Sequence, residues 1–165
     1  MRTEGDFHTH PMSCRMSKTF RTWFFVAFGT VAADQLTKAV ALHFEPYRLP
    51  IIPNFFSLTL TTNSGSIWGL GADYTRVLAW LGIVFVLLLC VFSRSFLRTH
   101  PMIGGFLTGG MVGNTIDRFA CGYVTDFLDF YIKSWHWPCF NVADIAITGT
   151  CLWLMFGGGA MKKGG

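Results

Sequence analysis

Four long apolar segments, separated by polar stretches, dominate the pattern along the chain. They cover residues 20–44, 76–93, 102–120 and 141–157. Most come close to the ~20 residues that a helix needs to cross the hydrocarbon core of a bilayer. The pattern therefore predicts a mainly α-helical membrane protein with four transmembrane helices in one domain, residues 20–160. Tails at residues 1–19 and 161–165 flank this domain.

The two longer connections, residues 45–75 and 121–140, are predicted to lie on the outer side of the membrane. Within the first, apolar and polar residues alternate over positions 56–61, and Asn63-Ser64-Gly65 follows as a turn signal. A period of two is typical of a β-strand, so a short β element is expected there. Trp135 and Trp137 in the second connection are expected to be interfacial anchors. The connection around Arg94 and Arg98 is expected to be a short inner loop.

Glycine recurs every four residues along the third apolar segment, at Gly105, Gly109 and Gly113. This spacing of small residues allows another helix to approach closely. The partner helix could come from the same chain or from a second one. We expect a monomer.

Composition and charge agree with a membrane protein and add an orientation. Apolar residues make up 52% of the chain and charged residues only 13%, about half the charge of an average soluble domain. Lys and Arg gather at residues 2–21, 94–98 and 162–163, which places both termini in the cytoplasm by the positive-inside rule. Basic and aromatic residues do not interleave as they do in nucleic-acid-binding proteins, so no nucleic-acid partner is expected.

Three features that resemble processing, redox or metal sites are given simpler interpretations. The first apolar segment resembles a secretory signal, but apolar character resumes after Lys38, which favours a membrane span. The five cysteines have no CxxC spacing; they are Cys14, Cys90, Cys121, Cys139 and Cys151. Only Cys121 and Cys139 could face an oxidising compartment together, and the sequence leaves open whether they pair. His8 and His10 lack further ligands at zinc spacing, so no metal site is expected.

Ionisable residues inside the apolar segments are costly and need an explanation. Asp34 and Lys38 are four residues apart, on one helix face. They could form a self-contained ion pair that lowers the cost of insertion, or they could line a polar cavity. Asn114, Asp117 and Arg118 also share one face, at the outer end of the third segment, which favours a buried polar network.

Further acidic residues gather near the same outer level. Asn141 and Asp144 open the fourth segment, where they could simply be a helix cap and a dipole-complementing acid. Asp126 and Asp129 lie just before it. Outer polar groups from three segments and both connections indicate a single site.

The residue types at this level favour acid–base chemistry by carboxylates. Motifs of serine hydrolases, zinc proteases and P-loop enzymes are absent from the sequence, and His136, between two Trp, is expected at the interface. Two neighbouring Asp side chains share a proton, so that one can activate water while the other polarises a carbonyl group. Spacing alone leaves five candidates, namely Asp34, Asp117, Asp126, Asp129 and Asp144.

Five blocks of residues, in order, resemble the lipoprotein signal peptidase (signal peptidase II) family, which are bacterial membrane aspartyl proteases. The resemblance covers residues 23–157, and the blocks are Asp34-Gln35-Leu36-Thr37-Lys38, Asn63-Ser64-Gly65, Gly110–Arg118, Val124-Thr125-Asp126-Phe127 and Phe140-Asn141-Val142-Ala143-Asp144. The chain departs from the family at Ser66-Ile67-Trp68 and in its long N-terminal tail.

The resemblance implies a catalytic pair and its supports. The catalytic pair would be Asp126 and Asp144. The residues that support the site or hold substrate would be Asp34, Lys38, Asn63, Gly65, Gly113, Asn114, Asp117, Arg118, Asn141 and Ala143. An extracytoplasmic β-cradle, built mostly from the first outer connection, is implied as well.

The resemblance also implies a substrate and a location. The substrates would be diacylglyceryl-modified prolipoproteins, cleaved on the amino side of the lipidated Cys, with membrane lipids as further partners and no cofactor or metal. The location would be the bacterial cytoplasmic (inner) membrane, with the active site near its outer face.

Two non-enzymatic functions compete with this interpretation. A small transporter or proton-relay protein could use Asp34, Asp117 and Asp144 as a polar path, and a lipid-binding assembly factor could use the same network structurally. A conducting path requires ionisable groups throughout the membrane depth. The inner halves of the four apolar segments lack them, which counts against conduction.

Overall fold

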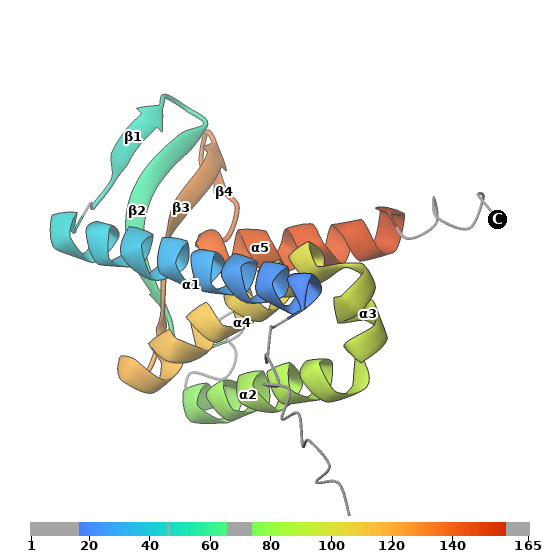
Figure 1. Ribbon diagram of the computed structural model, residues 1–165. Helices are drawn as coiled ribbons and strands as arrows, with labels where there is room; N and C mark the ends of the chain where they lie inside the picture. The colour runs from blue at the N-terminus through green and yellow to red at the C-terminus, as the bar shows by residue number, and fades with distance from the viewer. Residues whose placement is uncertain (1–16, 46, 66–73, 158–165) are drawn as a thin grey trace, which may run out of the picture.

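The computed structural model describes residues 17–45, 47–65 and 74–157 and contains a helical bundle with one small sheet (Figure 1). The helices are α1 (Lys18–Phe44), α2 (Thr75–Phe92), α3 (Arg94–Thr99), α4 (Pro101–Ala120) and α5 (Val142–Leu152), which a π-helical turn (Trp153–Gly157) extends. The strands are β1 (Leu49–Ile52), β2 (Phe56–Asn63), β3 (Val124–Ile132) and β4 (Trp135–His136). The features noted at His8, His10, Cys14 and Ser66-Ile67-Trp68, and most of both tails, lie outside the described residues.

Helix α4 is the centre of the bundle and contacts α1, α2 and α5. Its glycines allow α1 to approach, as the spacing predicted. A Cβ atom at Gly109 would lie 2.6 Å from the backbone oxygen of Ala27, and one at Gly105 would lie 2.9 Å from that of Trp23. The stripe therefore packs within one chain, against α1.

Two helices, α1 and α2, are long and apolar enough to cross a membrane, and α5 with its π-helical turn forms a shorter apolar helix. Helix α4 has the length of a span, but its glycines and the polar group at Asn114, Asp117 and Arg118 lower its hydropathy. The four-span arrangement therefore stays a prediction.

The sheet is antiparallel, in the order β1-β2-β3-β4, and stands at one end of the bundle, away from α3 (Figure 1). Strand β2 confirms the β element predicted from the alternation at residues 56–61. It pairs with β3 from Phe56 opposite Phe130 to Asn63 opposite Val124, with a register shift between Leu58 and Thr61.

The second connection contributes as many strands as the first, so the expectation of a sheet built mostly from the first connection was wrong. Strand β3 is the longest strand, and its first four residues, Val124 to Phe127, are all buried. A strand that is covered on both faces lacks the alternation of apolar and polar residues that identifies a half-exposed strand. The expected loop at residues 94–99 is likewise the short helix α3.

We expect Gly109→Ala to destabilise the bundle, because the added methyl group would meet the backbone of α1, which has little freedom to move. Gly149→Ala on α5 is the matched control, since a Cβ there has nothing within 4 Å. Thermal unfolding in detergent should show a lower Tm for Gly109→Ala and an unchanged or higher Tm for the control. Equal Tm values for the two variants would contradict close packing at Gly109.

Candidate functional site

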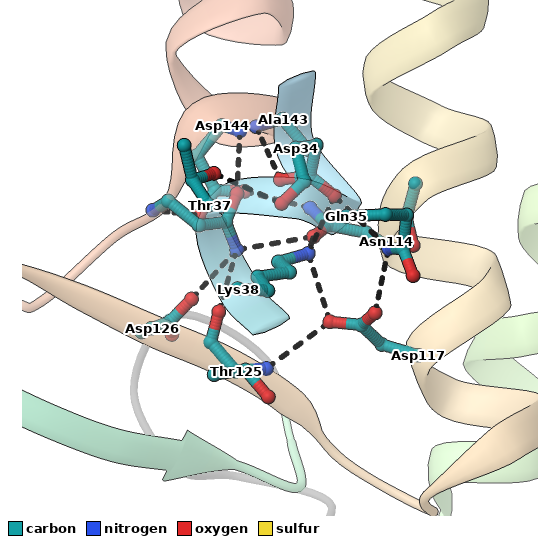
Figure 2. Close-up of polar contacts among 12 residues, drawn as sticks. Asp34, Gln35, Thr37, Lys38, Asn114, Asp117, Thr125, Asp126, Ala143 and Asp144 are labelled. Carbon is teal, nitrogen blue, oxygen red and sulfur yellow. Dashed lines mark hydrogen bonds and ion pairs between the residues drawn. The ribbon is translucent and has the colours of Figure 1, made fainter. Parts of the chain in front are cut away.

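A buried lysine joins two buried carboxylates at the centre of the site (Figure 2). Lys38 Nζ lies 2.8 Å from Asp34 Oδ2 and 2.8 Å from Asp117 Oδ2, and it donates to Asn114 Oδ1 at 3.1 Å. These three contacts use all three ammonium hydrogens. The side chains of Lys38 and Asp34 are 3% and 0% exposed, so the ion pairs are shielded from solvent.

The two carboxylates also fix neighbouring elements. Asp34 Oδ1 accepts a hydrogen bond from the backbone N–H of Ala143 on α5 at 2.9 Å. Asp117 Oδ2 accepts one from the N–H of Thr125 on β3 at 3.2 Å. Gln35 donates to Asp117 Oδ1 at 2.8 Å. The cluster thereby connects α1, α4, α5 and β3.

Two asparagines link this cluster to a second pair of carboxylates. Asn114 Nδ2 donates to Asp144 Oδ1 at 2.8 Å, and Asn141 Nδ2 donates to Asp126 Oδ1 at 2.7 Å. Asn141 Nδ2 also lies 3.1 Å from Asn114 Oδ1. Asp126 and Asp144 are therefore held by one polar network, and no hydrogen bond joins the two carboxyl groups directly.

The side chain of Asn141 caps helix α5 and also binds Asp126. Its side-chain oxygen accepts from the N–H of Asp144 at 2.9 Å, and Asp144 Oδ2 accepts from the N–H of Asn141 at 3.2 Å, which forms a reciprocal capping box at the start of α5. Its amide nitrogen holds Asp126. The helix-cap and the site interpretations of Asn141 therefore both apply.

Asp126 and Asp144 both line one cavity of about 450 Å³. Asn63, Asn114 and Arg118 line it as well, while Leu78 and Ile147 form an apolar side. Arg118 Nη1 donates to the backbone oxygen of Asn114 at 3.2 Å, but its buried Nε has no partner among the residues that the structure describes. The cavity thus offers two carboxyl groups, an unused guanidinium donor and an apolar surface.

Burial raises the pKa of Asp126 from 3.8 to about 7, and the charge of Asp144 adds to the rise. Hydrogen bonds from Asn141 and Asn63, and the charge of Lys38, oppose it. A carboxyl group that is close to half-protonated at neutral pH can donate a proton, while a neighbouring carboxylate accepts one. This combination suits general acid–base chemistry on a bound substrate.

The twelve residues predicted for the site lie close together in the structure. For two of them, Asp34 and Lys38, the structure matches neither of the two expected arrangements. The Asp34–Lys38 pair is not self-contained, because Lys38 also binds Asp117. Nor does the pair line the cavity. Its hydrogen bonds and ion pairs reach the elements that carry Asp144 and, through Asp117, Asp126. Gly113 leaves room for it, since a Cβ atom there would lie 2.5 Å from Asp34 Oδ2.

A second buried polar cluster was missed in the sequence. Asp129 accepts from Ser57 Oγ at 2.9 Å, and its other oxygen lies 2.8 Å from His136 Nδ1. This contact gives His136 a carboxylate partner, and its expected place at the membrane interface stays a prediction. The cluster joins β2, β3 and β4. From the sequence it could have been found only through the cross-strand pairs, and these require the strand register.

Cys139 is the other residue that sequence reasoning left unused. Its thiol is free, as is that of Cys121, and it lines both the cavity of Asp126 and a neighbouring cavity of about 790 Å³ beside Asp129 and His136. Burial raises the pKa of the Cys139 thiol, which keeps the side chain neutral. The sequence left open whether Cys121 and Cys139 pair, and in this structure both thiols are free.

Comparison with known sequences gives one family. A family model described as signal peptidase (SPase) II matches residues 26–157. A lipoprotein signal peptidase of Burkholderia mallei (strain SAVP1) is 36% identical over 141 residues, which cover 81% of this chain and 85% of the relative. One of Desulforapulum autotrophicum is 40% identical over 132 residues, 72% of this chain and 79% of the relative.

Two solved structures share the fold. Both are described as bacterial membrane enzyme structures obtained by the in meso method. One superposes with a TM-score of 0.75 at 25% identity, over 87% of this chain and 90% of its own. The other gives a TM-score of 0.72 at 26% identity, over 88% and 95%.

We expect Asp126→Asn to become more stable relative to the wild type as the pH rises. The folded state holds this carboxyl at a pKa of about 7 and the unfolded state near 3.8, so ionisation favours unfolding between these values. One unit of pKa corresponds to about 1.4 kcal/mol, so the cost approaches about 4 kcal/mol above pH 7 and vanishes below pH 4. The amide keeps an oxygen acceptor for Asn141.

The measurement is Tm in detergent at pH 5, 6, 7 and 8. The difference between Asp126→Asn and the wild type should grow across this series. Glu45→Gln, which removes an exposed carboxyl group, should show no such growth. Parallel profiles for Asp126→Asn and the wild type would contradict the raised pKa.

Lys38→Met should destabilise the protein strongly, because it leaves Asp34 and Asp117 facing each other without a cation. Removing one partner of a buried ion pair typically costs about 3–5 kcal/mol. Lys18→Met, at an exposed position of α1, is the control and should have almost no effect. Thermal unfolding would reveal the difference, and similar Tm values for both variants would show that Lys38 is dispensable.

Proposed function

The chain belongs to the signal peptidase II family of proteases, and on that basis we propose that it removes signal peptides from diacylglyceryl-modified prolipoproteins by an aspartyl mechanism. Asp126 and Asp144 are the catalytic pair, and the cut falls on the amino side of the lipidated Cys. One observation carries the proposal. Two carboxyl groups from different elements share one cavity and are held from a common network of asparagines.

The environment of each carboxyl group suggests its role. Asp126 has a pKa near neutrality, which suits the group that carries the shared proton at rest. With that proton on Asp126, Asp144 is the carboxyl group left ionised, and the amide of Asn114 and the N–H of Asn141 donate to its two oxygens. Asp144 is therefore assigned the role of the base.

The reaction proceeds through a tetrahedral intermediate. Asp144 takes a proton from a water molecule, whose oxygen attacks the carbonyl carbon of the scissile bond, while Asp126 gives its proton to the carbonyl oxygen. The C–N bond then breaks. The proton held by Asp144 passes to the leaving amine of the lipidated Cys, and the former carbonyl oxygen returns its proton to Asp126.

The remaining features of the cavity suit a lipidated peptide. The unpartnered Nε of Arg118 can donate to a peptide carbonyl group. Leu78 on α2 and Ile147 on α5 give the cavity an apolar side, which suits acyl chains that enter from the membrane. Asn63 and Gly65, at the end of β2 and just after it, approach from the sheet.

The same proposal includes the membrane arrangement. The protein spans the bacterial inner membrane four times with both termini in the cytoplasm, and it works as a monomer. The sheet then forms an extracytoplasmic cradle beside the active site. Two observations support this orientation. The sheet and α3 lie at opposite ends of the bundle (Figure 1), and α3 carries Arg94 and Arg98, which the positive-inside rule assigns to the cytoplasm.

We expect Asp126→Asn and Asp144→Asn each to abolish cleavage, because an amide can neither give the proton that Asp126 supplies nor accept the proton that Asp144 takes from water. Loss of one general acid or base commonly costs about 10²–10⁴ in rate. The assay follows removal of the signal peptide from a diacylglyceryl-modified precursor by purified protein in detergent. Asp129→Asn is the matched control, since Asp129 lies on the same strand but binds Ser57 and His136.

The control should retain cleavage per folded molecule. If both Asn variants at positions 126 and 144 still cleave at the wild-type rate, the peptidase mechanism is wrong. A wild-type protein that leaves the lipidated precursor intact would favour a purely lipid-binding or transport function instead.

A further inference from the structure

The end of the bundle opposite the sheet is where α1 begins and α3 follows α2 (Figure 1). A further cavity, apart from the two beside the sheet, lies there. Its volume is about 300 Å³, at the lower end of the range of small-molecule pockets. Its lining includes Ser17, Phe20, Trp23, Arg94, Leu97 and Arg98. We call it the Arg94–Arg98 cavity.

The two arginines of this cavity have no anionic partner within the described part of the chain. Both side chains are exposed, and the ion pairs formed among residues 17–45, 47–65 and 74–157 involve other residues. The sequence contains no Asp or Glu from position 7 to 33 or from 74 to 116. Helices α2 and α3 and the first half of α1 therefore offer these guanidinium groups no carboxylate.

The positive field at the cavity has a further source. Helix α1 has 27 residues and begins at Lys18, next to the cavity-lining Ser17. Its N-terminal end carries the partial positive charge of the helix dipole. Lys18 and Arg21 add charge nearby without lining the cavity. An anion would gain from all of these groups together.

The interior of the cavity is apolar and aromatic, unlike that of a simple anion site. Phe20, Trp23 and Leu97 line it, and Trp23 is fixed by a hydrogen bond from its Nε1 to Thr108 Oγ1 at 3.3 Å. Along α1, the rings of Phe20, Phe24 and Phe28 stack in a row and are largely exposed. The cationic rim thus continues into an apolar helix surface.

We propose that the Arg94–Arg98 cavity binds the phosphate headgroup of an anionic membrane phospholipid. The guanidinium groups of Arg94 and Arg98 contact the phosphate oxygens through charge-assisted hydrogen bonds. The acyl chains run along the Phe20–Phe24–Phe28 row. This site is separate from the cavity of Asp126 and Asp144, and the proposal does not depend on the peptidase function.

The apolar lining distinguishes a lipid from a free phosphate ion. Inorganic phosphate could bind the two arginines but would make no contact with the apolar side chains of Phe20 and Leu97. A phospholipid uses both parts, because apolar contact and a charged headgroup each contribute to its binding. A zwitterionic lipid brings the phosphate together with a cationic group, which the surrounding basic residues repel.

The test measures binding of dioleoylphosphatidylglycerol to the full-length protein in mixed micelles, by Tm and by lipid retention in native mass spectrometry. We expect this lipid to raise Tm, with dioleoylphosphatidylcholine and inorganic phosphate much less effective. The Arg94→Gln/Arg98→Gln variant should weaken binding at least about tenfold, since it removes two charge-assisted contacts.

The matched control is Lys18→Gln/Arg21→Gln, which removes the same charge from the same end of the bundle but leaves the cavity lining intact. It should retain most of the effect of the lipid. If the double arginine variant fails to fold, Arg94→Gln and Arg98→Gln are measured singly and should each weaken binding. The proposal is overturned if both double variants respond equally, or if inorganic phosphate protects as well as the lipid does.

Discussion

The salt bridges of Lys38 with Asp34 and Asp117 are the constraint on which the remaining site depends. Two carboxylates and one ammonium group are buried together, so the cluster keeps a net negative charge away from water. Such a cluster persists only where hydrogen bonds stabilise the surplus charge. The N–H groups of Ala143 and Thr125 and the amide of Gln35 provide them. Each of these donors is fixed on or beside an element that carries a site residue.

The cluster holds the elements that carry Asp126 and Asp144, and its three charged side chains do not line their cavity. Asp34 holds the backbone at Ala143, directly before Asp144. Asp117 holds the backbone at Thr125, directly before Asp126. Asn141 then closes the arrangement by capping α5 and binding Asp126. Because these contacts form in the protein alone, the polar environment of the pair is set before a substrate arrives, which is the arrangement that lowers reorganisation during reaction.

Much of this site could be predicted from the sequence, because its helical parts follow from spacing. Asp34 with Lys38, and Asn114 with Asp117, share a helix face at any packing geometry. The sheet was harder to predict. Strand β3 is buried on both faces at its start, and the Ser57–Asp129–His136 cluster depends on strand register. The double role of Asn141 also required the tertiary structure, since a cap alone satisfied the local pattern.

The spacing of Asp34 and Lys38 matters while the protein is being synthesised. Helix α1 leaves the ribosome long before Asp117, Thr125 and Ala143 exist. At that stage its two charged groups have only each other, and their separation of four residues lets them pair within one helix. The ion pair can therefore form within α1 alone. Its two side chains gain their contacts with the later elements α4, β3 and α5 afterwards. A chain with these two charges on opposite faces of α1 would lack this protection during its synthesis.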